Sequence, residues 1–283
     1  MSIKSELLEL AADAASRVAM PAITDAYIPE PDPGAGRHTE FGILALADGA
    51  AGLYYAWLGD SQRGMAERFS EASLRSRRAE ELAALYAGRD EAECSIGLAA
   101  ISAITHSIYR RAGYEPAPAP DSTGALAAHP GDHIGMVGYF PPLVARLREQ
   151  DLRLTVIEQT PRLVQREGNF EVTLDAAALG TCNKVLITAA TLLNDTIEDV
   201  LAHTARAGEV IVLGPTAGFF PDPLFARGVT GVAGTWIDDP AAAIARQRSG
   251  EPMGDSTHKT LVRRDEYPGF NALVAAVARA ASA

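Results

Sequence analysis

Cysteine is scarce, and the sequence has no dense set of metal-binding side chains. The two cysteines, Cys94 and Cys182, lie far apart, and neither forms a CxxC pair. This usage excludes a disulfide framework and is typical of a reducing compartment. Zinc and soft-metal sites usually show closer sets of Cys and His, whereas the closest set here, His129, Asp132 and His133, spans a Pro-Gly turn. The sequence alone therefore indicates no metal site, and the identity of any bound metal stays open.

Positive charge and long apolar runs are also lacking. The formal net charge is -11 at pH 7, and nucleic acids need a basic face, so a nucleic-acid partner is not expected. No segment approaches the ~20 apolar residues that a membrane span needs. Residues 1–18 carry Glu6 and Glu9 within a helical apolar pattern, which predicts an amphipathic helix and not a signal peptide. We expect a cytoplasmic protein without a membrane partner.

Motifs for nucleotides and for nucleophilic catalysis are missing. The first strand–helix junction of the second half, GMVGYFPP at residues 135–142, lacks the GxGxxG pattern that lets a backbone approach a pyrophosphate. The sequence contains no GxxxxGKS or GxxxxGKT loop, no GxSxG elbow and no cysteine with an adjacent histidine. Neither NAD nor ATP is therefore expected as a cofactor.

The length and composition of the chain suggest two domains. A chain of 283 residues can form one large domain or two of moderate size. Residues 116–132 contain alternating Pro and Ala, which favour an extended linker. We therefore expect one domain over residues 1–115 and a second over residues 133–283.

The first domain mixes strands with helices. Two apolar, strand-like runs flank Asp48-Gly49, a dipeptide that suits a hairpin turn. Apolar residues then recur at helical spacing over residues 90–112, and Gly113 follows as a stop signal. These patterns predict a smaller α+β domain.

Strands and helices alternate through the second domain, and such alternation builds a parallel sheet with right-handed crossovers. The strands are continuous apolar runs, as expected when helices cover both faces of the sheet. The predicted fold class is therefore α/β, with a three-layer Rossmann-like domain. We expect its strands at residues 133–140, 152–159, 184–188, 209–215 and 230–237, and a helix that starts near residue 194 and ends at Gly208.

Ligands bind open parallel sheets beyond the carboxyl ends of the strands. Two carboxylates at such positions, Glu158 and Asp195, are the expected acid and base groups. The residues expected to contact a ligand are Tyr139, Phe140, Thr188, Thr191, Asn194, Gly214, Pro215, Thr216 and Trp236. A second interpretation of the turn at residues 194–196 needs no ligand, because one of its side chains would cap the helix beginning at Ile197.

Four segments of the second half occur in this order: GMVGYFPPLVARLRE, VLITAATLLNDTIEDVL, VIVLGPTAGFFPDPLFARGVTGVAG and TWIDDP. Together they resemble the DUF364 family, whose name is "putative heavy-metal chelation". Upstream, AECSIGLAAISAI resembles DUF4213, the usual N-terminal partner of that family, which has an enolase-N-terminal-like fold. The resemblance implies a smaller α+β domain followed by a Rossmann-like domain, with a metal-related ligand in the cleft between them.

One turn departs from the family pattern. Where family members show a TGTTLINGT-like turn, this chain has TAATLLNDT, so that Ala189, Ala190 and Asp195 replace Gly, Thr and Gly. Ala189 loses the freedom for positive φ that Gly allows, and Ser102 stands where the family helix has Asn. We expect the turn within residues 185–201 to decide the specificity of a divergent member.

Three functions follow as hypotheses. The first is a small-molecule-binding protein that handles a metal or a metal chelate. The second is a cofactor-independent enzyme of small-metabolite (natural product) biosynthesis, which catalyses a cyclisation, elimination or group transfer with Glu158, Asp195 or Asp238 as acid or base. The third is a non-catalytic assembly protein, with the apolar loop at residues 218–225 on a partner if its phenylalanines are exposed, whereas a packed lid is an equal interpretation of the same loop. A homodimer is expected.

Overall fold

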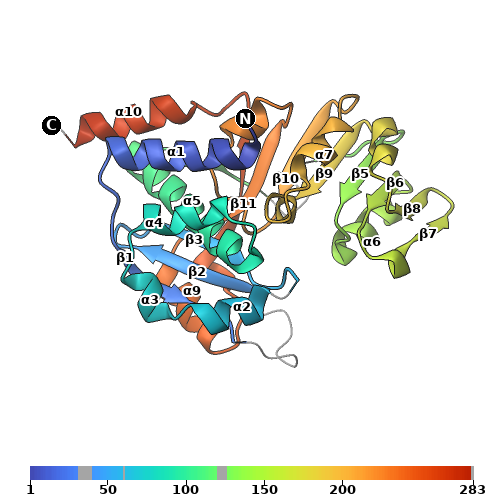
Figure 1. Ribbon diagram of the computed structural model, residues 1–283. Coiled ribbons are helices and arrows are strands. Elements are labelled where there is room, and N and C mark those ends of the chain that lie inside the picture. Colours follow the sequence, from blue (N-terminus) through green and yellow to red (C-terminus); the bar gives the residue numbers. More distant parts are fainter. Residues whose placement is uncertain (31–39, 60, 120–125, 282–283) are drawn as a thin grey trace.

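The parallel sheet that the strand–helix alternation predicts is present in a computed structural model, which describes residues 1–30, 40–59, 61–119 and 126–281 (Figure 1). The strands of this sheet are β4 (Ala117–Pro118), β5 (His133–Val137), β6 (Arg153–Ile157), β7 (Gln165–Glu167), β8 (Phe170–Thr173), β9 (Lys184–Thr188), β10 (Glu209–Leu213), β11 (Gly231–Ile237) and β12 (Thr257–Arg263). They lie in the order β4-β12-β11-β10-β9-β5-β6-β8-β7.

The core of this sheet has the strand order of a Rossmann domain. Strands β8, β6, β5, β9, β10 and β11 are parallel neighbours, which in chain order is the arrangement 3-2-1-4-5-6. Strand β12 adds an antiparallel neighbour to β11, and β4 pairs with β12. At the other edge, β7 pairs antiparallel with β8. The expected α/β class is therefore confirmed, whereas the parallel strand β8 and the antiparallel edge strands are not among the five predicted strands.

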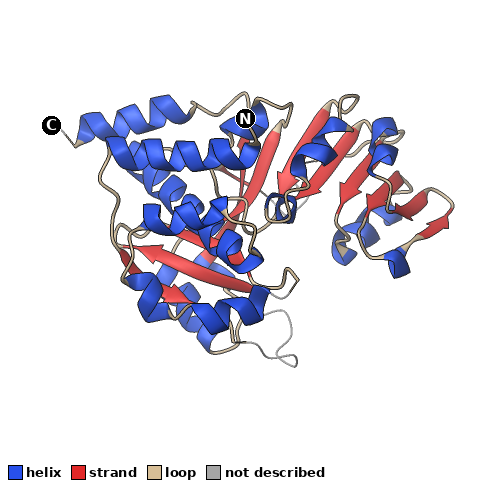
Figure 2. Ribbon diagram, in the orientation of Figure 1, coloured by secondary structure: helices blue, strands red, loops and turns tan. Residues whose placement is uncertain are grey.

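Helices lie on both faces of the sheet (Figure 2). Every residue of β5 and of β11 is buried, as the continuous apolar runs predict. The helices of this half are α6 (Pro141–Glu149), α7 (Ile197–Ala202), α8 (Asp222–Phe225), α9 (Pro240–Arg248) and α10 (Phe270–Ala280), with 3₁₀ helices η3 (Pro161–Leu163), η4 (Ala176–Thr181), η5 (Ala189–Leu192) and η6 (Gly254–Ser256).

Helix α7 is shorter than predicted, since it ends at Ala202 and does not continue to Gly208. The Thr204 hydroxyl donates a hydrogen bond to the Leu201 carbonyl at 2.9 Å and so supplies a partner for the last turn. The Gly208 amide then bonds the Asn183 carbonyl at 2.9 Å, which fixes the chain at the start of β10 instead of in a helix.

The N-terminal region is the expected smaller α+β unit. Its strands form an antiparallel sheet in the order β1-β2-β3. The elements are α1 (Ile3–Arg17), β1 (Ile23–Tyr27), β2 (Phe41–Leu46), β3 (Ala51–Tyr55), α2 (Ser61–Arg68), α3 (Glu71–Arg75), α4 (Ala79–Ala83), η2 (Ala84–Ala87) and α5 (Glu91–Ala112). Part of the expected linker, residues 120–125, lies outside the described residues.

Both local signals of this region are confirmed. The hairpin between β2 and β3 turns at Gly49, whose φ is 80°, and the Asp48 carboxylate accepts the Ala50 amide at 3.1 Å. Helix α5 ends at Gly113, which adopts the left-handed conformation with φ 69°. Within the described residues, no helix is long and apolar enough to cross a membrane.

The apolar loop at residues 218–225 is packed into the core and does not present an exposed patch. Phe219 and Phe220 are 2% and 0% exposed, and the Phe220 ring meets the Phe270 ring edge-on, with centroids 4.9 Å apart. The hypothesis of an assembly protein that uses this loop is therefore wrong in its premise. The loop instead joins the two halves, because Tyr109 of α5 lies 6.1 Å from Phe220.

Candidate functional site

The candidate site lies where the direction of the crossovers reverses. From β5 the chain crosses to β6 on one side, and after β8 it returns to β9 on the other side of β5. The carboxyl ends of β5 and β9 are thus neighbours at a topological switch point, which is where open α/β sheets bind ligands.

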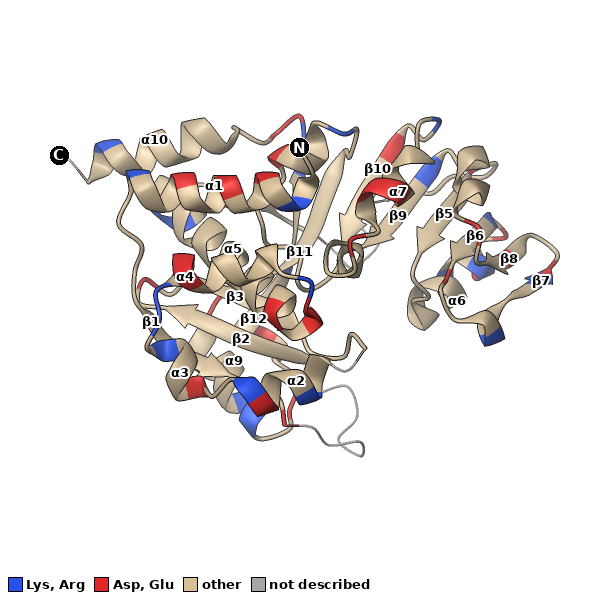
Figure 3. Cartoon of the chain, in the orientation of Figure 1, with Lys and Arg blue, Asp and Glu red and all other residues tan. Residues whose placement is uncertain are grey.

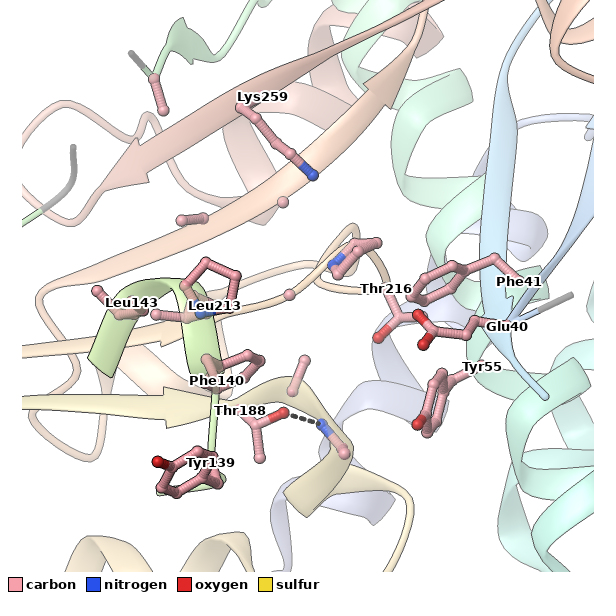
Figure 4. A pocket seen from close by; sticks show the side chains of 18 of the residues that line it. Glu40, Phe41, Tyr55, Tyr139, Phe140, Leu143, Thr188, Leu213, Thr216 and Lys259 are labelled. Carbon is pink, nitrogen blue, oxygen red and sulfur yellow. Dashed lines mark hydrogen bonds between the residues drawn. The ribbon is translucent and has the colours of Figure 1, made fainter. Parts of the chain in front are cut away.

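A cavity of about 470 Å³ opens at this switch point (Figure 4). The segments that follow β5, β9 and β10 form one side of it. The N-terminal region forms the opposite wall with Glu40, Phe41 and Tyr55, and β12 contributes Lys259. The cavity therefore lies between the two parts of the chain.

The predicted ligand contacts divide into two groups. Those that line the cavity are Tyr139, Phe140, Thr188, Gly214, Pro215 and Thr216. Those that lie outside its lining are Thr191, Asn194, Trp236 and the two carboxylates, Glu158 and Asp195. The hydrogen bonds of the second group show what each of them does in the fold.

Glu158 fixes the backbone of the turn that forms the cavity wall. One carboxylate oxygen accepts the Tyr139 amide at 3.0 Å. The other accepts the amides of Gln159 at 2.8 Å and Thr160 at 3.3 Å. These bonds tie the exit of β5 to the exit of β6, so Glu158 positions Tyr139 and Phe140 for the cavity.

Two threonines at the carboxyl end of β9, Thr188 and Thr191, act together. The Thr188 hydroxyl, in the cavity wall, accepts the Ala190 amide at 3.3 Å (Figure 4). The buried Thr191 hydroxyl donates to the Thr188 carbonyl at 2.7 Å. Thr191 therefore shapes η5, while Thr188 keeps lone-pair capacity for a ligand.

The segment that follows β10 depends on two glycines, one for its own conformation and one in β11 that lets the two segments approach closely. Gly214 has φ 150° and directly follows β10. A side chain at Gly234 of β11 would overlap the Ala217 carbonyl. The chain at Ala217 can therefore approach β11 this closely only because Gly234 has no Cβ.

Trp236 faces away from the cavity and packs against the N-terminal region. Its ring lies 4.6 Å from the ring of His106 in α5, measured between centroids. The His106 Nδ1 is 2.8 Å from the Ala51 carbonyl oxygen. On the other side of the ring, Gly218 leaves room for Nε2, because a Cβ at this position would lie only 2.8 Å from it. Trp236 thus holds β11 against α5.

The burial of His106 predicts a pH-dependent stability. Burial lowers its pKa from 6.5 to about 4. Between these values the unfolded chain binds a proton that the folded chain does not, so stability falls as pH falls from about 6.5 to about 4. This shift corresponds to about 3 kcal/mol at the acid end. Between pH 7 and pH 4.5, urea unfolding of His106→Gln should show a smaller decrease in unfolding free energy than the wild type shows. An equal decrease would contradict this prediction. His203→Gln is the control and should show the same decrease as the wild type.

The turn at residues 194–196 anchors the N-terminal helix. The Asp195 carboxylate pairs with Lys4 of α1 at 3.1 Å, and the Glu198 carboxylate accepts the Ile3 amide at 2.8 Å. Figure 3 shows acidic positions on both α1 and α7. The Tyr86 hydroxyl adds a bond to the Leu192 carbonyl at 2.8 Å. The segment from Leu192 to Glu198 therefore binds the N-terminal region at several points.

The predicted helix cap is not formed in the expected way. Thr196 occupies the N-cap position without a side-chain bond to the helix. The Asn194 side chain instead accepts the Thr196 hydroxyl at 2.6 Å and the Thr196 amide at 3.4 Å, which closes an Asx turn. Asp195 has φ 57°, so the position where the family shows Gly still adopts the left-handed conformation.

Asp195→Asn is expected to have a small effect on stability. Asn tolerates the left-handed backbone, and the Lys4–Asp195 pair has side chains that are 17% and 54% exposed, so its coupling should not exceed ~1 kcal/mol. A double-mutant cycle with Lys4→Met, measured by urea unfolding, tests this value. A coupling above about 2 kcal/mol would contradict the exposed-pair assignment.

One wall of the cavity and its lysine are not apparent from the amino-acid sequence. Glu40, Phe41 and Tyr55 belong to an antiparallel sheet far away in the sequence. Lys259 lies on β12, whose polar sequence THKTLVR does not read as a buried strand. Its ammonium donates to the Thr235 hydroxyl at 2.8 Å, and burial lowers its pKa below 10.5.

The cavity does not offer the ligands of a bare heavy-metal ion. Among the described residues, no group of three or more His, Cys, Asp or Glu side chains could hold a metal. Glu40 is the one carboxylate among the described residues that line the cavity, and neither buried cysteine lines it. His133 bonds the Thr181 carbonyl at 3.0 Å and the Thr155 hydroxyl at 2.8 Å, so it belongs to the core. These donors do not fit a soft metal ion.

Sequence comparison links the second half of the chain to a known family. The profile of the DUF364 family, described as "Putative heavy-metal chelation", matches residues 122–263. An uncharacterized protein of Methanocaldococcus jannaschii is 29% identical over 156 residues, which cover 55% of this chain. The match spans 59% of that relative, less than two thirds of its length.

Two crystal structures of DUF364 proteins with unknown function have a similar fold. The structure from Pyrococcus horikoshii superposes with a TM-score of 0.66 at 17% identity, covering 91% of this chain and 99% of its own. The structure from Desulfitobacterium hafniense gives 0.63 at 22% identity and covers 92% and 99%. At these identities the similarity establishes the fold of almost the whole chain.

Proposed function

The chain belongs to the DUF364 family, described as "putative heavy-metal chelation", and from this premise we propose that it binds a small organic molecule, alone or holding a metal ion. The binding place is the cavity at the switch point. The observation that supports this most is the cavity wall, which combines apolar surface with few polar groups and a single carboxylate among its described residues.

The wall has the composition of a small-molecule site. Pockets of ~300–1,000 Å³ lined by aromatic and aliphatic groups, with a few placed polar groups, are typical of such sites. The cavity of about 470 Å³ has this size, and its apolar surface comes from both parts of the chain. Its polar groups include the Thr188, Thr216 and Thr260 hydroxyls, Glu40 and Lys259.

The composition of the cavity wall is compatible with the family description if the metal is bound by an organic chelator. A chelator supplies its own ligand atoms, so the protein needs to contact only the organic part and its charge. The hydroxyls then orient the molecule, and the aromatic rings of Phe41, Tyr55 and Tyr139 bury it. A bare ion would need a set of protein ligands that the described residues do not provide.

A single compound can separate these cases. 8-Hydroxyquinoline-5-sulfonate is flat, aromatic and anionic, and it chelates Zn²⁺. Equilibrium dialysis would measure binding of Zn²⁺ alone, of the chelator alone and of the 1:1 complex. We expect the chelator or its complex to bind near one equivalent, and Zn²⁺ alone to bind weakly. Tight binding of Zn²⁺ alone, with no binding of chelator or complex, would contradict the proposal.

The N-terminal region has a proposed role in the same site. We propose that residues 1–115 are the DUF4213-like domain, residues 116–132 the linker and residues 133–283 the DUF364 domain. The antiparallel β1-β2-β3 sheet packed by α5 supports this division. Since Glu40, Phe41 and Tyr55 come from this region, the domain would complete the cavity.

A further inference from the structure

Lysine is rare in this chain, which uses arginine for nearly all of its positive charge. Of its 25 Lys and Arg residues, only Lys4, Lys184 and Lys259 are lysines. Lys4 pairs with Asp195 at 3.1 Å, and Lys184 pairs with Asp132 at 3.0 Å. In the part of the chain that the structure describes, Lys259 forms no ion pair. The lysine in the cavity is therefore unlike the other two.

The surroundings of Lys259 disfavour the charged form of its amino group relative to the neutral form. The side chain extends from β12 toward the cavity (Figure 4), and its Nζ donates to the hydroxyl of Thr235, its partner in the β11–β12 register. A hydroxyl compensates a charge much less than a carboxylate does, and burial lowers the Lys259 pKa by removing water from the charged form. The other titratable groups that line the cavity are Glu40, Tyr55, Tyr139 and Arg146.

The choice of lysine over arginine narrows the role of this group. A guanidinium stays protonated and binds anions in a fixed fork, whereas a buried amine can lose its proton and react. Lysine becomes a nucleophile toward carbonyl compounds when an apolar pocket desolvates it. Lys259 is half-buried, and its side chain faces a largely apolar cavity that is large enough for a metabolite.

We propose that Lys259 forms an imine with a ligand that carries an aldehyde or ketone group, an inference that rests on the proposed binding function and names the class of its substrate. The Nζ lone pair forms a bond to the carbonyl carbon, and the C=O π pair moves to oxygen. Two protons pass from nitrogen to that oxygen, the C–O bond breaks, and water leaves. The product is a C=N bond at Lys259, with no change of oxidation state.

Reductive trapping of the full chain tests this reaction. The probe is 4-carboxybenzaldehyde with sodium cyanoborohydride at pH 7.5, followed by peptide mapping with mass spectrometry. We expect Lys259 to be labelled at least tenfold faster than Lys4 and Lys184, which are controls within the same molecule. Its labelling should reach half of its maximum at a lower pH than theirs. In Lys259→Arg, the fast label should disappear and not move to another lysine.

Equal labelling of the three lysines, or no label on Lys259, would overturn the imine. The chelator dialysis separates this failure from that of the binding proposal. If 8-hydroxyquinoline-5-sulfonate binds but Lys259 stays unlabelled, the cavity is a binding site and the imine inference is wrong. If the chelator and its complex do not bind and Lys259 reacts like Lys4, both proposals are wrong. Slower labelling of Lys259 in the presence of the chelator supports both.

Discussion

Ala190→Phe is expected to weaken binding of 8-hydroxyquinoline-5-sulfonate, or of its Zn²⁺ complex, by about 100-fold, which is about 2.8 kcal/mol. Ala190 is half-buried in η5, lines the cavity and donates its amide to the Thr188 hydroxyl. A benzyl group at this position would occupy the space between the two walls while leaving the backbone bond in place. Equilibrium dialysis at matched protein concentration measures the change.

Ala177→Phe is the matched control for this variant. Ala177 is an exposed residue in another 3₁₀ helix, η4, and it does not line the cavity. It should bind the probe like the wild type, and both variants should keep the wild-type circular dichroism spectrum. Unchanged affinity in a folded Ala190→Phe protein would place the binding site elsewhere.

Gly52→Ala is expected to cost about 3 kcal/mol of unfolding free energy, the upper end of the usual range for overpacking, because overpacking against backbone cannot relax by a rotamer change. Gly52 lies in β3 where α5 crosses it, and a Cβ there would overlap the Ala99 carbonyl. The helix would have to move away from the sheet that carries Tyr55. Thermal unfolding should show a decrease in Tm of about 6–10 °C.

Gly180→Ala provides the comparison for this effect. Gly180 lies in η4, where a Cβ would meet nothing within 4 Å. The substitution should be neutral or slightly stabilising, since alanine loses less backbone entropy on folding. If both variants unfold at the same temperature, the close approach of α5 to β3 is not a constraint on this fold.

Periodicity predicted most of the fold because the signals are local. The buried strands β5, β9 and β10 are apolar on both faces, and the ends of the long helix and of the hairpin are marked by Gly113 and Gly49. Strand β12 could not be found this way. Its first half, Thr257 to Lys259, is polar and partly exposed, so the strand is defined by pairing with β11 and not by its own pattern.

The site was predictable only as far as the carboxyl-end rule extends. That rule located Thr188, the last residue of β9, and Tyr139 and Thr216, which follow β5 and β10 within three residues. The rule did not predict Phe41 or Lys259, because these residues reach the cavity through contacts between segments that are distant in the sequence. One signal was present in the sequence, because Lys259 is the sole lysine after residue 184, in a segment that otherwise uses arginine.

The turn TAATLLNDT acquires two roles that the sequence did not separate. Its first residues, Thr188 to Ala190, line the cavity. Its last residues hold the N-terminal helix through Asp195 and Lys4. The departures from the family pattern at Ala189 and Ala190 therefore lie in the cavity wall, whereas the departure at Asp195 lies at the contact with α1.

Anomalous diffraction from a crystal soaked with the Zn²⁺ complex of 8-hydroxyquinoline-5-sulfonate would show whether the cavity binds a chelated metal. We expect a zinc peak inside the cavity, near Thr188, Thr216 and Lys259, with chelator density around it and with chelator atoms completing the zinc coordination. A crystal soaked in Zn²⁺ alone should show no peak there. A zinc peak held by protein side chains alone, or chelator density only outside the cavity, would contradict the proposed binding of a chelator in this cavity.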